Sequence, residues 1–245
     1  MTQRILWTIN GTDRLDFLQN LVTNDVMVLR QDGIIWTGLL TPQGKYLADF
    51  FVLRRGDDLL IDIAEPLAES TLRRLSMYRL RADVQIVPSD LKVARGLGPM
   101  PDGAFADPRH SGMGWRLYDT DAIEAPEDWD ALRVRHTIPE SGIELTPDTF
   151  ILEAGFERLN GVDFRKGCYV GQEVTARMKH KTELKKGLRR VAISKPVPVG
   201  TEITANEKPA GTIFTTAGNE AIAYLRFDRI NSGMMANNAT VSIID

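Results

Sequence analysis

The chain has few of the residues that most metal and redox sites use. Cys168 is the only cysteine among 245 residues, and the three histidines are His110, His136 and His180. A single cysteine excludes an intramolecular disulfide and a cysteine-based structural zinc site. The histidines are scattered, and no pair has the i, i+4 spacing of a helical metal site. We therefore predict no bound metal.

Long apolar runs and phosphate-binding loops are missing as well. No run approaches the ~20 apolar residues of a bilayer-spanning helix, and residues 1–7 lack the apolar core of a signal peptide. Residues 96–98 read Gly-Leu-Gly, without the third glycine and the helix of a dinucleotide fingerprint. The net charge of −3 gives no overall reason to expect a nucleic-acid or membrane partner. We expect a cytoplasmic protein that binds neither.

The first half of the chain carries both helix and strand signals. Thr12 stands where an N-cap belongs, ahead of an apolar helical face. Strand runs at 34–40, 46–53 and 59–63 are separated by short turns that contain glycine, which is typical of a meander of hairpins. Pro66 suits the first turn of a second helix. These signals predict an α+β arrangement.

Residues after Gly187 change in character. Short strand candidates follow one another with turn signals between them, a pattern typical of a small antiparallel barrel or sandwich. A domain boundary is therefore expected near residues 185–187. The strand candidates are residues 188–193, 201–204, 211–214, 221–225 and 240–243.

The segment around the cysteine carries the most information. Cys168 lies among glycines, close to Lys166 and Tyr169. A neighbouring cation favours the thiolate over the thiol, and a helix that begins near residues 171–173 adds to that effect. The alternative is a strand–turn–helix junction around a small buried cysteine. The residues alone leave both interpretations open.

Residues 166–173 read Lys-Gly-Cys-Tyr-Val-Gly-Gln-Glu. This string resembles the signature of the YgfZ-type folate-binding proteins, which are related to the glycine-cleavage aminomethyltransferases. The resemblance covers about residues 5–195 and continues weakly beyond them. Further matching segments are residues 11–26, 40–45, 78–84 and 138–139.

The resemblance implies an α+β fold, a three-part ring of the aminomethyltransferase type with a C-terminal antiparallel β-barrel. A discontinuous first domain, residues 1–38 with 112–185, carries the cysteine motif. An inserted α+β domain occupies residues 39–111. The barrel domain is expected at residues 186–245.

The resemblance also implies a function. We expect a tetrahydrofolate-binding accessory protein that supports assembly or repair of iron–sulfur proteins, without classical aminomethyltransferase activity. Cys168 would be its reactive thiol and Lys166 the activator of that thiol. The implied ligand is tetrahydrofolate or a one-carbon or polyglutamyl derivative. The implied partners are iron–sulfur client or assembly proteins.

Two other functions stay open. The first is a folate-dependent aminomethyltransferase or demethylase, for which Asp25 and Asp49 lie in the right part of the chain, although we interpret both as solvated turn or strand-end aspartates. The second is a non-catalytic, folate-sensing scaffold whose Cys168 is buried and unreactive.

The folate site is assigned from the same resemblance. Trp129 corresponds to the tryptophan of the family's channel, and its ring suits a flat pterin; a core anchor on a helix is the alternative. A second family tryptophan, near the N-terminus, has no counterpart, since the matching position falls near Arg4. The remaining assigned folate contacts are Tyr169, Gln172, Glu173 and Arg177.

Residues 165–190 are strongly basic. They contain nine Lys or Arg residues and two acidic ones, Glu173 and Glu183. Such a cluster attracts carboxylates, so it favours the glutamate tail of folate or an acidic partner. A solvated helix face is the alternative.

Overall fold

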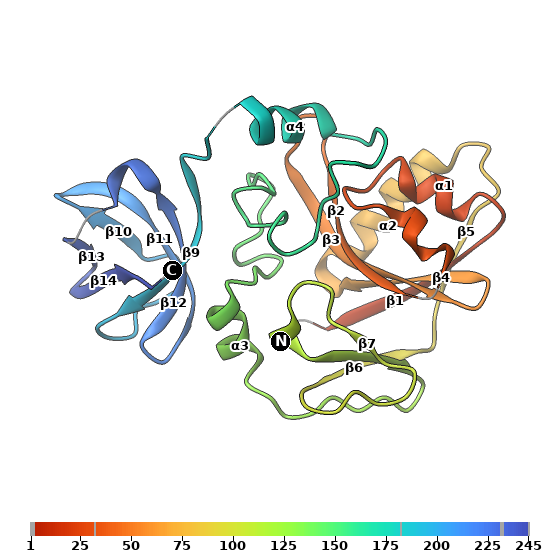
Figure 1. Ribbon diagram of the computed structural model, residues 1–245, viewed down its shortest axis with the longest axis horizontal. Coiled ribbons are helices and arrows are strands. Elements are labelled where there is room, and N and C mark those ends of the chain that lie inside the picture. Colours follow the sequence, from red (N-terminus) through yellow and green to blue (C-terminus); the bar gives the residue numbers. More distant parts are fainter. Residues whose placement is uncertain (1–2, 32, 182, 231–232, 245) are drawn as a thin grey trace. The chain divides into compact units, whose positions relative to one another are not determined.

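The computed structural model describes residues 3–31, 33–181, 183–230 and 233–244 (Figure 1). Its internal contacts divide the chain into two compact units. We call residues 1–126 with 156–176 the N-terminal unit, and residues 127–155 with 177–245 the barrel unit. The three-domain division stays a prediction.

A five-stranded antiparallel sheet forms the centre of the N-terminal unit, in the order β2-β3-β4-β1-β5. It combines strands from both sides of the boundary predicted at residue 38. Buried apolar side chains on both faces explain the nearly continuous apolar runs in its sequence. The strands are β1 (Arg4–Asn10), β2 (Ile34–Leu40), β3 (Tyr46–Arg55), β4 (Asp58–Ala64) and β5 (Gln85–Pro88).

Helices α1 (Arg14–Gln19) and α2 (Glu65–Arg79) pack against this sheet. Phe17, Leu18 and Leu75 join its strand residues in one buried core. A short 3-10 helix, Val26–Arg30, follows α1. The predicted N-cap is wrong: Asp13 is the residue before α1, while the hydroxyl and amide of Thr12 donate to the carboxylate of Asp83.

A second, three-stranded sheet has the order β6-β8-β7. Its Tyr118 joins Leu6, Leu53 and Leu60 of the five-stranded sheet in a separate core cluster. Strands β7 and β8 were not predicted from the sequence. The strands are β6 (Lys92–Gly96), β7 (Phe105–Ala106) and β8 (Trp115–Asp119).

A buried ion pair network also connects these two sheets. Asp62 of β4 accepts hydrogen bonds from Arg4, Arg116 and Tyr118. Burial would raise the pKa of Asp62, but the two guanidinium groups lower it well below its usual range. The guanidinium of Arg116 also lies 3.8 Å from the centre of the Phe51 ring. The charges of Asp62 and Arg116 are therefore both buried and paired with each other.

The barrel unit contains a closed, six-stranded barrel with antiparallel neighbours, in the order β10-β11-β12-β9-β14-β13. Its interior is filled by small and branched apolar side chains. The predicted C-terminal barrel is confirmed. The strands are β9 (Lys186–Ile193), β10 (Glu202–Ala205), β11 (Lys208–Ala217), β12 (Glu220–Arg226), β13 (Met234–Ala236) and β14 (Ala239–Ile243).

Helix α3 (Trp129–His136) is tied to the barrel by a buried arginine. Arg133 donates to the carboxylate of Glu144 and to the hydroxyl of Thr215 in β11. Glu144 in turn accepts from the Thr215 amide and hydroxyl. These bonds fix the start of the segment that leaves α3.

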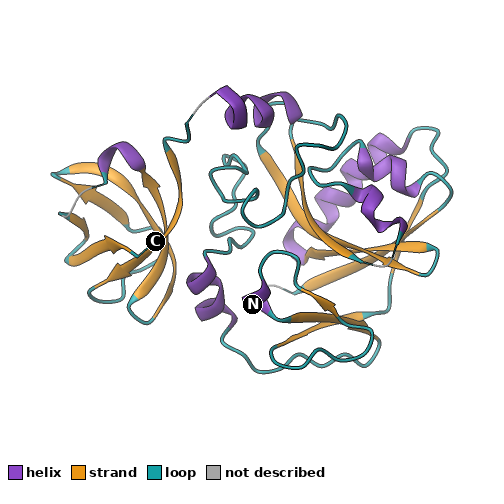
Figure 2. Ribbon diagram, in the orientation of Figure 1, coloured by secondary structure: helices purple, strands orange, loops and turns teal. Residues whose placement is uncertain are grey.

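Loops and turns make up most of residues 137–171, between α3 and helix α4 (Gln172–Lys181), as Figure 2 shows. The last part of this segment, before α4, carries the cysteine motif. No helix in the described part of the chain is long and apolar enough to cross a membrane.

Candidate functional site

Cys168 is exposed to solvent on the loop that precedes α4. The neighbouring Gly167 is exposed too, whereas Lys166 and Tyr169 on either side of this pair are buried. The interpretation of Cys168 as a small buried residue is therefore wrong. The loop presents a thiol at an exposed tip between two buried side chains.

Lys166 holds this loop against the end of α1. Its Nζ donates to the backbone carbonyls of Gln19 (2.7 Å), Val22 (2.5 Å) and Asn24 (3.0 Å). A lysine ammonium has three N–H donors, and these three bonds use all of them. The side chain therefore acts as a clamp on main-chain oxygens, and its role as thiol activator stays a prediction from the sequence.

Burial affects the titration of both side chains beside the tip. It lowers the pKa of Lys166 to about 8, while the nearby carboxylates of Asp25 and Asp163 act in the opposite direction. Burial raises the pKa of Tyr169 to about 12. The ammonium lies 5.0 Å from the centre of the Tyr169 ring, within the range of a cation–π contact. At neutral pH, Lys166 is therefore mainly charged and Tyr169 neutral.

A second anchor lies just after the cysteine. Gly171 has a φ of +86°, and a Cβ added there would lie 2.5 Å from the carbonyl oxygen of Thr41. Gly44, at the turn between β2 and β3, is equally close to α4: its added Cβ would lie 2.8 Å from Val174. Glycine is therefore required where α4 begins on the β2–β3 turn.

A third anchor precedes the motif. Thr23 donates from its hydroxyl to the carbonyl of Gly161 (2.6 Å) and accepts at its own carbonyl from the amide of Asp163. The Asn24 side chain donates to the carbonyl of Asn160 (2.7 Å). Residues 23–24 thus bind the incoming chain, and the Cys168 tip is held on both sides by the same unit.

The predicted folate contacts lie in different surroundings. The side chains of Trp129 and Tyr169 are only 3% and 7% exposed. In contrast, Glu173 and Arg177 are exposed on α4, and Gln172 is partly exposed at its first position. The predicted helix start at residues 171–173 is confirmed. Of the assigned residues, Lys166, Cys168, Tyr169, Gln172 and Glu173 lie on the motif in the N-terminal unit.

Two aspartates of the alternative enzyme function have structural partners. Asp25 caps the 3-10 helix by accepting from the amide of Met27, as a turn aspartate does. Asp49 was interpreted as a solvated residue, and this is wrong. It is buried on β3 and accepts from Trp36 Nε1 (2.9 Å) and from the Tyr46 hydroxyl (2.6 Å).

No group of three His, Cys, Asp or Glu side chains in the described ranges is arranged to hold a metal ion. The nucleophilic group exposed at the tip of the loop is the thiol of Cys168.

The sequence of this chain is similar to those of several known proteins. The family described as "CAF17, C-terminal beta-barrel domain" matches residues 185–245. The human protein named "Iron-sulfur cluster assembly factor IBA57, mitochondrial" is 29% identical over 276 residues, which cover 93% of this chain and 76% of that protein. The mouse protein of the same name is 27% identical over 274 residues, with the same coverage.

A bacterial relative is similar at the same level. The "tRNA-modifying protein YgfZ" of Vibrio vulnificus is 27% identical over 255 residues, covering 89% of this chain and 77% of that protein. This chain is a homologue of these proteins. The family resemblance predicted from the cysteine motif is thereby confirmed.

A solved structure confirms the fold. The glycine cleavage system aminomethyltransferase T of Bartonella henselae superposes with a TM-score of 0.77, over 97% of this chain and 81% of that protein. The two sequences are 14% identical, so the likeness concerns the fold. The aminomethyltransferase-type fold with a C-terminal barrel is as predicted.

Sequence reasoning missed the acceptors of Lys166. Gln19, Val22 and Asn24 contribute only their backbone carbonyls, which any residue could supply. The one available signal was the end of the predicted α1, where carbonyl groups lack helical partners and attract cations.

Proposed function

We propose that this chain supports the assembly or repair of iron–sulfur proteins through the thiol of Cys168, and that it binds tetrahydrofolate or a derivative of it. The observation that carries the proposal is the exposed Cys168 between two buried anchors. The names of the mammalian homologues support the iron–sulfur role. Those names also say mitochondrial; for this chain we keep the cytoplasm as the proposed location.

The thiol acts on a sulfur-containing partner. As a thiolate, Cys168 attacks one sulfur of a disulfide or persulfide on the partner. A new sulfur–sulfur bond to Cys168 forms, the partner's bond breaks, and the second partner sulfur leaves as a thiolate. The step needs no oxidant, because the attacked bond is already oxidised. A single cysteine also lacks the four ligands with which a cluster is usually held.

The folate part of the proposal rests on the family resemblance and the shared fold. The residues assigned from sequence fit a pterin poorly, since the rings of Trp129 and Tyr169 are covered and offer no open face for stacking. The exposed Arg177 of α4 fits a carboxylate of a glutamate tail. Folate is therefore proposed as a bound ligand that takes no part in the thiol step.

Alkylation of the native protein tests the thiol. Cys168 is the only cysteine, so iodoacetamide labelling followed by mass spectrometry reports on it alone. We expect complete labelling at a rate within about tenfold of that in 8 M urea. A native rate lower by a factor of about a thousand would instead support the scaffold function with an unreactive cysteine.

Calorimetric titration with 5-formyltetrahydrofolate, a stable reduced folate, tests the ligand. Equal affinity of the wild type and of Trp129→Leu, which removes the aromatic face, would argue against stacking of the pterin on Trp129. Absence of binding by 5-formyl-, 5-methyl- and unsubstituted tetrahydrofolate would remove folate from the proposal and leave the thiol function standing.

The fold match alone favours a true one-carbon transferase. Both carboxylate oxygens of Asp49 already accept hydrogen bonds from Trp36 and Tyr46, which leaves that residue badly placed to orient a substrate amine. Formation of methylenetetrahydrofolate from an aminomethyl-lipoyl carrier protein would establish this function.

A further inference from the structure

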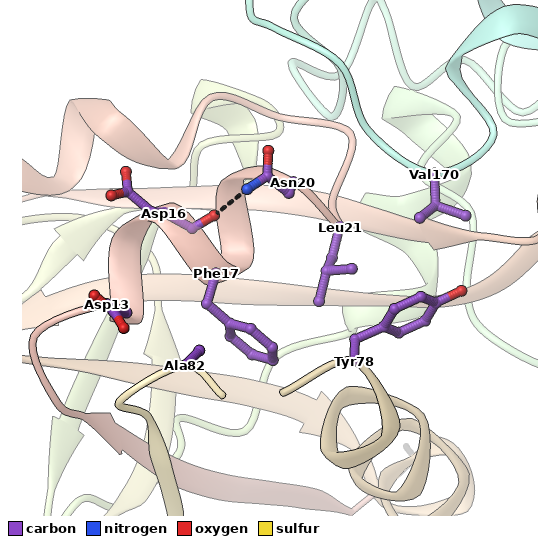
Figure 3. A pocket seen from close by; sticks show the side chains of 8 residues that line it. All are labelled: Asp13, Asp16, Phe17, Asn20, Leu21, Tyr78, Ala82 and Val170. Carbon is purple, nitrogen blue, oxygen red and sulfur yellow. Dashed lines mark hydrogen bonds between the residues drawn. The ribbon is translucent and has the colours of Figure 1, made fainter. Parts of the chain in front are cut away.

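A pocket opens on the N-terminal unit between α1 and the end of α2 (Figure 3). Its volume is about 480 Å³. Phe17 extends into it from α1, Leu21 from the chain just after α1, and Tyr78 lies on the side of α2. Its lining residues are Asp13, Asp16, Phe17, Asn20, Leu21, Tyr78, Ala82 and Val170.

Two exposed apolar residues, which we call the rim, stand close to the lining residues Tyr78 and Ala82 in the sequence. Met77, beside Tyr78, is 72% exposed, and Leu80 is 88% exposed. Leu80 also has a φ of +45°, a conformation that leucine rarely adopts. Strained residues persist where the surrounding structure or a function requires them. The fold gains no burial from the Leu80 side chain, which is therefore available for contact with another molecule.

The pocket and the thiol share a loop. Val170, which forms one wall, belongs to the same motif as Cys168 and lies two residues after it. The buried Lys166 fixes this motif against the end of α1, the helix that forms the opposite wall. A protein seated in the pocket therefore lies close to the exposed Cys168.

The charges around the pocket are asymmetric. Asp13 and Asp16 are the only charged side chains in its described lining. Asp13 already accepts from the amide of Asp83, whereas Asp16 is exposed in the first turn of α1. Arg79 and Arg81 follow at the exposed end of α2. The α1 side therefore attracts a cation.

We propose that this pocket and its rim dock a segment of the iron–sulfur partner protein that carries a large apolar side chain next to a lysine or arginine. The apolar side chain enters between Phe17 and Tyr78, and the basic residue faces Asp16. This inference rests on the proposed function and names the surface that brings the partner's sulfur to Cys168.

Leu80→Gly separates docking from folding. Glycine adopts the positive φ without strain, so the melting temperature should stay the same or rise. Loss of an exposed apolar anchor should nevertheless weaken partner binding roughly tenfold. A variant that is as stable and as well bound to the partner as the wild type would overturn the inference.

Photo-cross-linking in cells identifies the occupant. p-Benzoylphenylalanine replaces Met77 in the full-length chain, and a control protein carries it in place of Ile123, which is 87% exposed in a loop elsewhere on the same unit. We expect adducts at position 77 with an iron–sulfur assembly or client protein, mapped to a segment of the stated chemistry. Asp16→Lys should reduce their yield by roughly threefold to tenfold, because attraction becomes repulsion.

Other outcomes contradict the proposal. Adducts no more abundant than at position 123, adducts insensitive to Asp16→Lys, an acidic cross-linked segment, or adducts to RNA would each overturn it. Combining the probe at Met77 with Cys168→Ser distinguishes the two claims. If the adduct persists and the thiol proves dispensable for iron–sulfur enzyme activity, the docking surface stands and the proposed thiol function fails.

Discussion

The amino group of Lys166 donates a hydrogen bond to the backbone carbonyl of Val22, 144 residues earlier in the sequence, at 2.5 Å. With Gln19 and Asn24 as further acceptors, it binds the cysteine loop to the end of α1. Lys166 thus determines where the thiol sits and does not contact it through a hydrogen bond. This relationship leads to the first two predictions.

Lys166→Met should loosen the loop and destabilise the N-terminal unit. Methionine keeps most of the volume but leaves three carbonyls without their donor, so the free energy of unfolding should fall by about 2–3 kcal/mol. Amide hydrogen exchange at residues 161–171 should accelerate. Lys179→Met, at an exposed position of α4, is the matched control and should change little. Equal exchange in both variants would contradict the clamp.

The stability contributed by Lys166 should depend on pH. Its pKa falls from 10.5 in the unfolded chain to about 8 in the folded one. The unfolded state therefore binds more protons between these values, and stability rises with pH. The difference in unfolding free energy between wild type and Lys166→Met should grow by about 2 kcal/mol from pH 7 to pH 10. Urea denaturation at several pH values measures it; a difference that shrinks with rising pH would refute the lowered pKa of Lys166.

Gly171→Ala should disturb the start of α4. The positive φ and the close approach of the Thr41 carbonyl both oppose a side chain there. We expect a loss of about 1–3 kcal/mol in unfolding free energy. Gly167→Ala is the control from the same loop, because no described atom lies within 4 Å of its added Cβ; its stability should be nearly unchanged. Similar losses in both variants would contradict this prediction, because they could not come from the contact between position 171 and the Thr41 carbonyl.

Asp62→Asn should be the most damaging of these changes. It leaves Arg4 and the buried Arg116 without their carboxylate, at a cost of about 3–5 kcal/mol. Because the pKa of Asp62 is lowered, its contribution is present above about pH 4 and is lost as the pH falls further. Chemical denaturation should therefore show a difference between variant and wild type that is about 1 kcal/mol smaller at pH 3 than at pH 7, because the unfolded chain binds a proton at pH 3 while the folded carboxylate stays ionised. Asp57→Asn, with a fully exposed carboxylate, should behave as wild type.

Local patterns predicted much of the fold. The runs at 34–40 and 59–63 became β2 and β4, and the short runs after Gly187 became a closed barrel. Apolar runs bounded by turns are a local signal, so sequence reasoning could find them. Strand β8 was missed because it alternates buried arginine and tyrosine with other residues, and Arg116 is stable inside because it pairs with the carboxylates of Asp62 and Asp107.

Part of the site was also predicted from local sequence signals. The motif pointed to Cys168 and to the start of α4, both local features. The partners of Lys166 and the contact of Gly171 with Thr41 depend on residues more than a hundred positions away. Sequence spacing cannot reveal them, because backbone carbonyls carry no residue-specific signal. The burial of Trp129 and Asp49 likewise follows from tertiary packing.

The central claim is that Cys168 is the group that acts. The most direct measurement is the activity of iron–sulfur enzymes in cells that lack the endogenous gene and carry either wild-type chain or Cys168→Ala at equal abundance. We predict that the variant folds with an unchanged melting temperature, because the side chain is exposed, and restores almost none of the activity. Restoration to the wild-type level by Cys168→Ala would contradict the account.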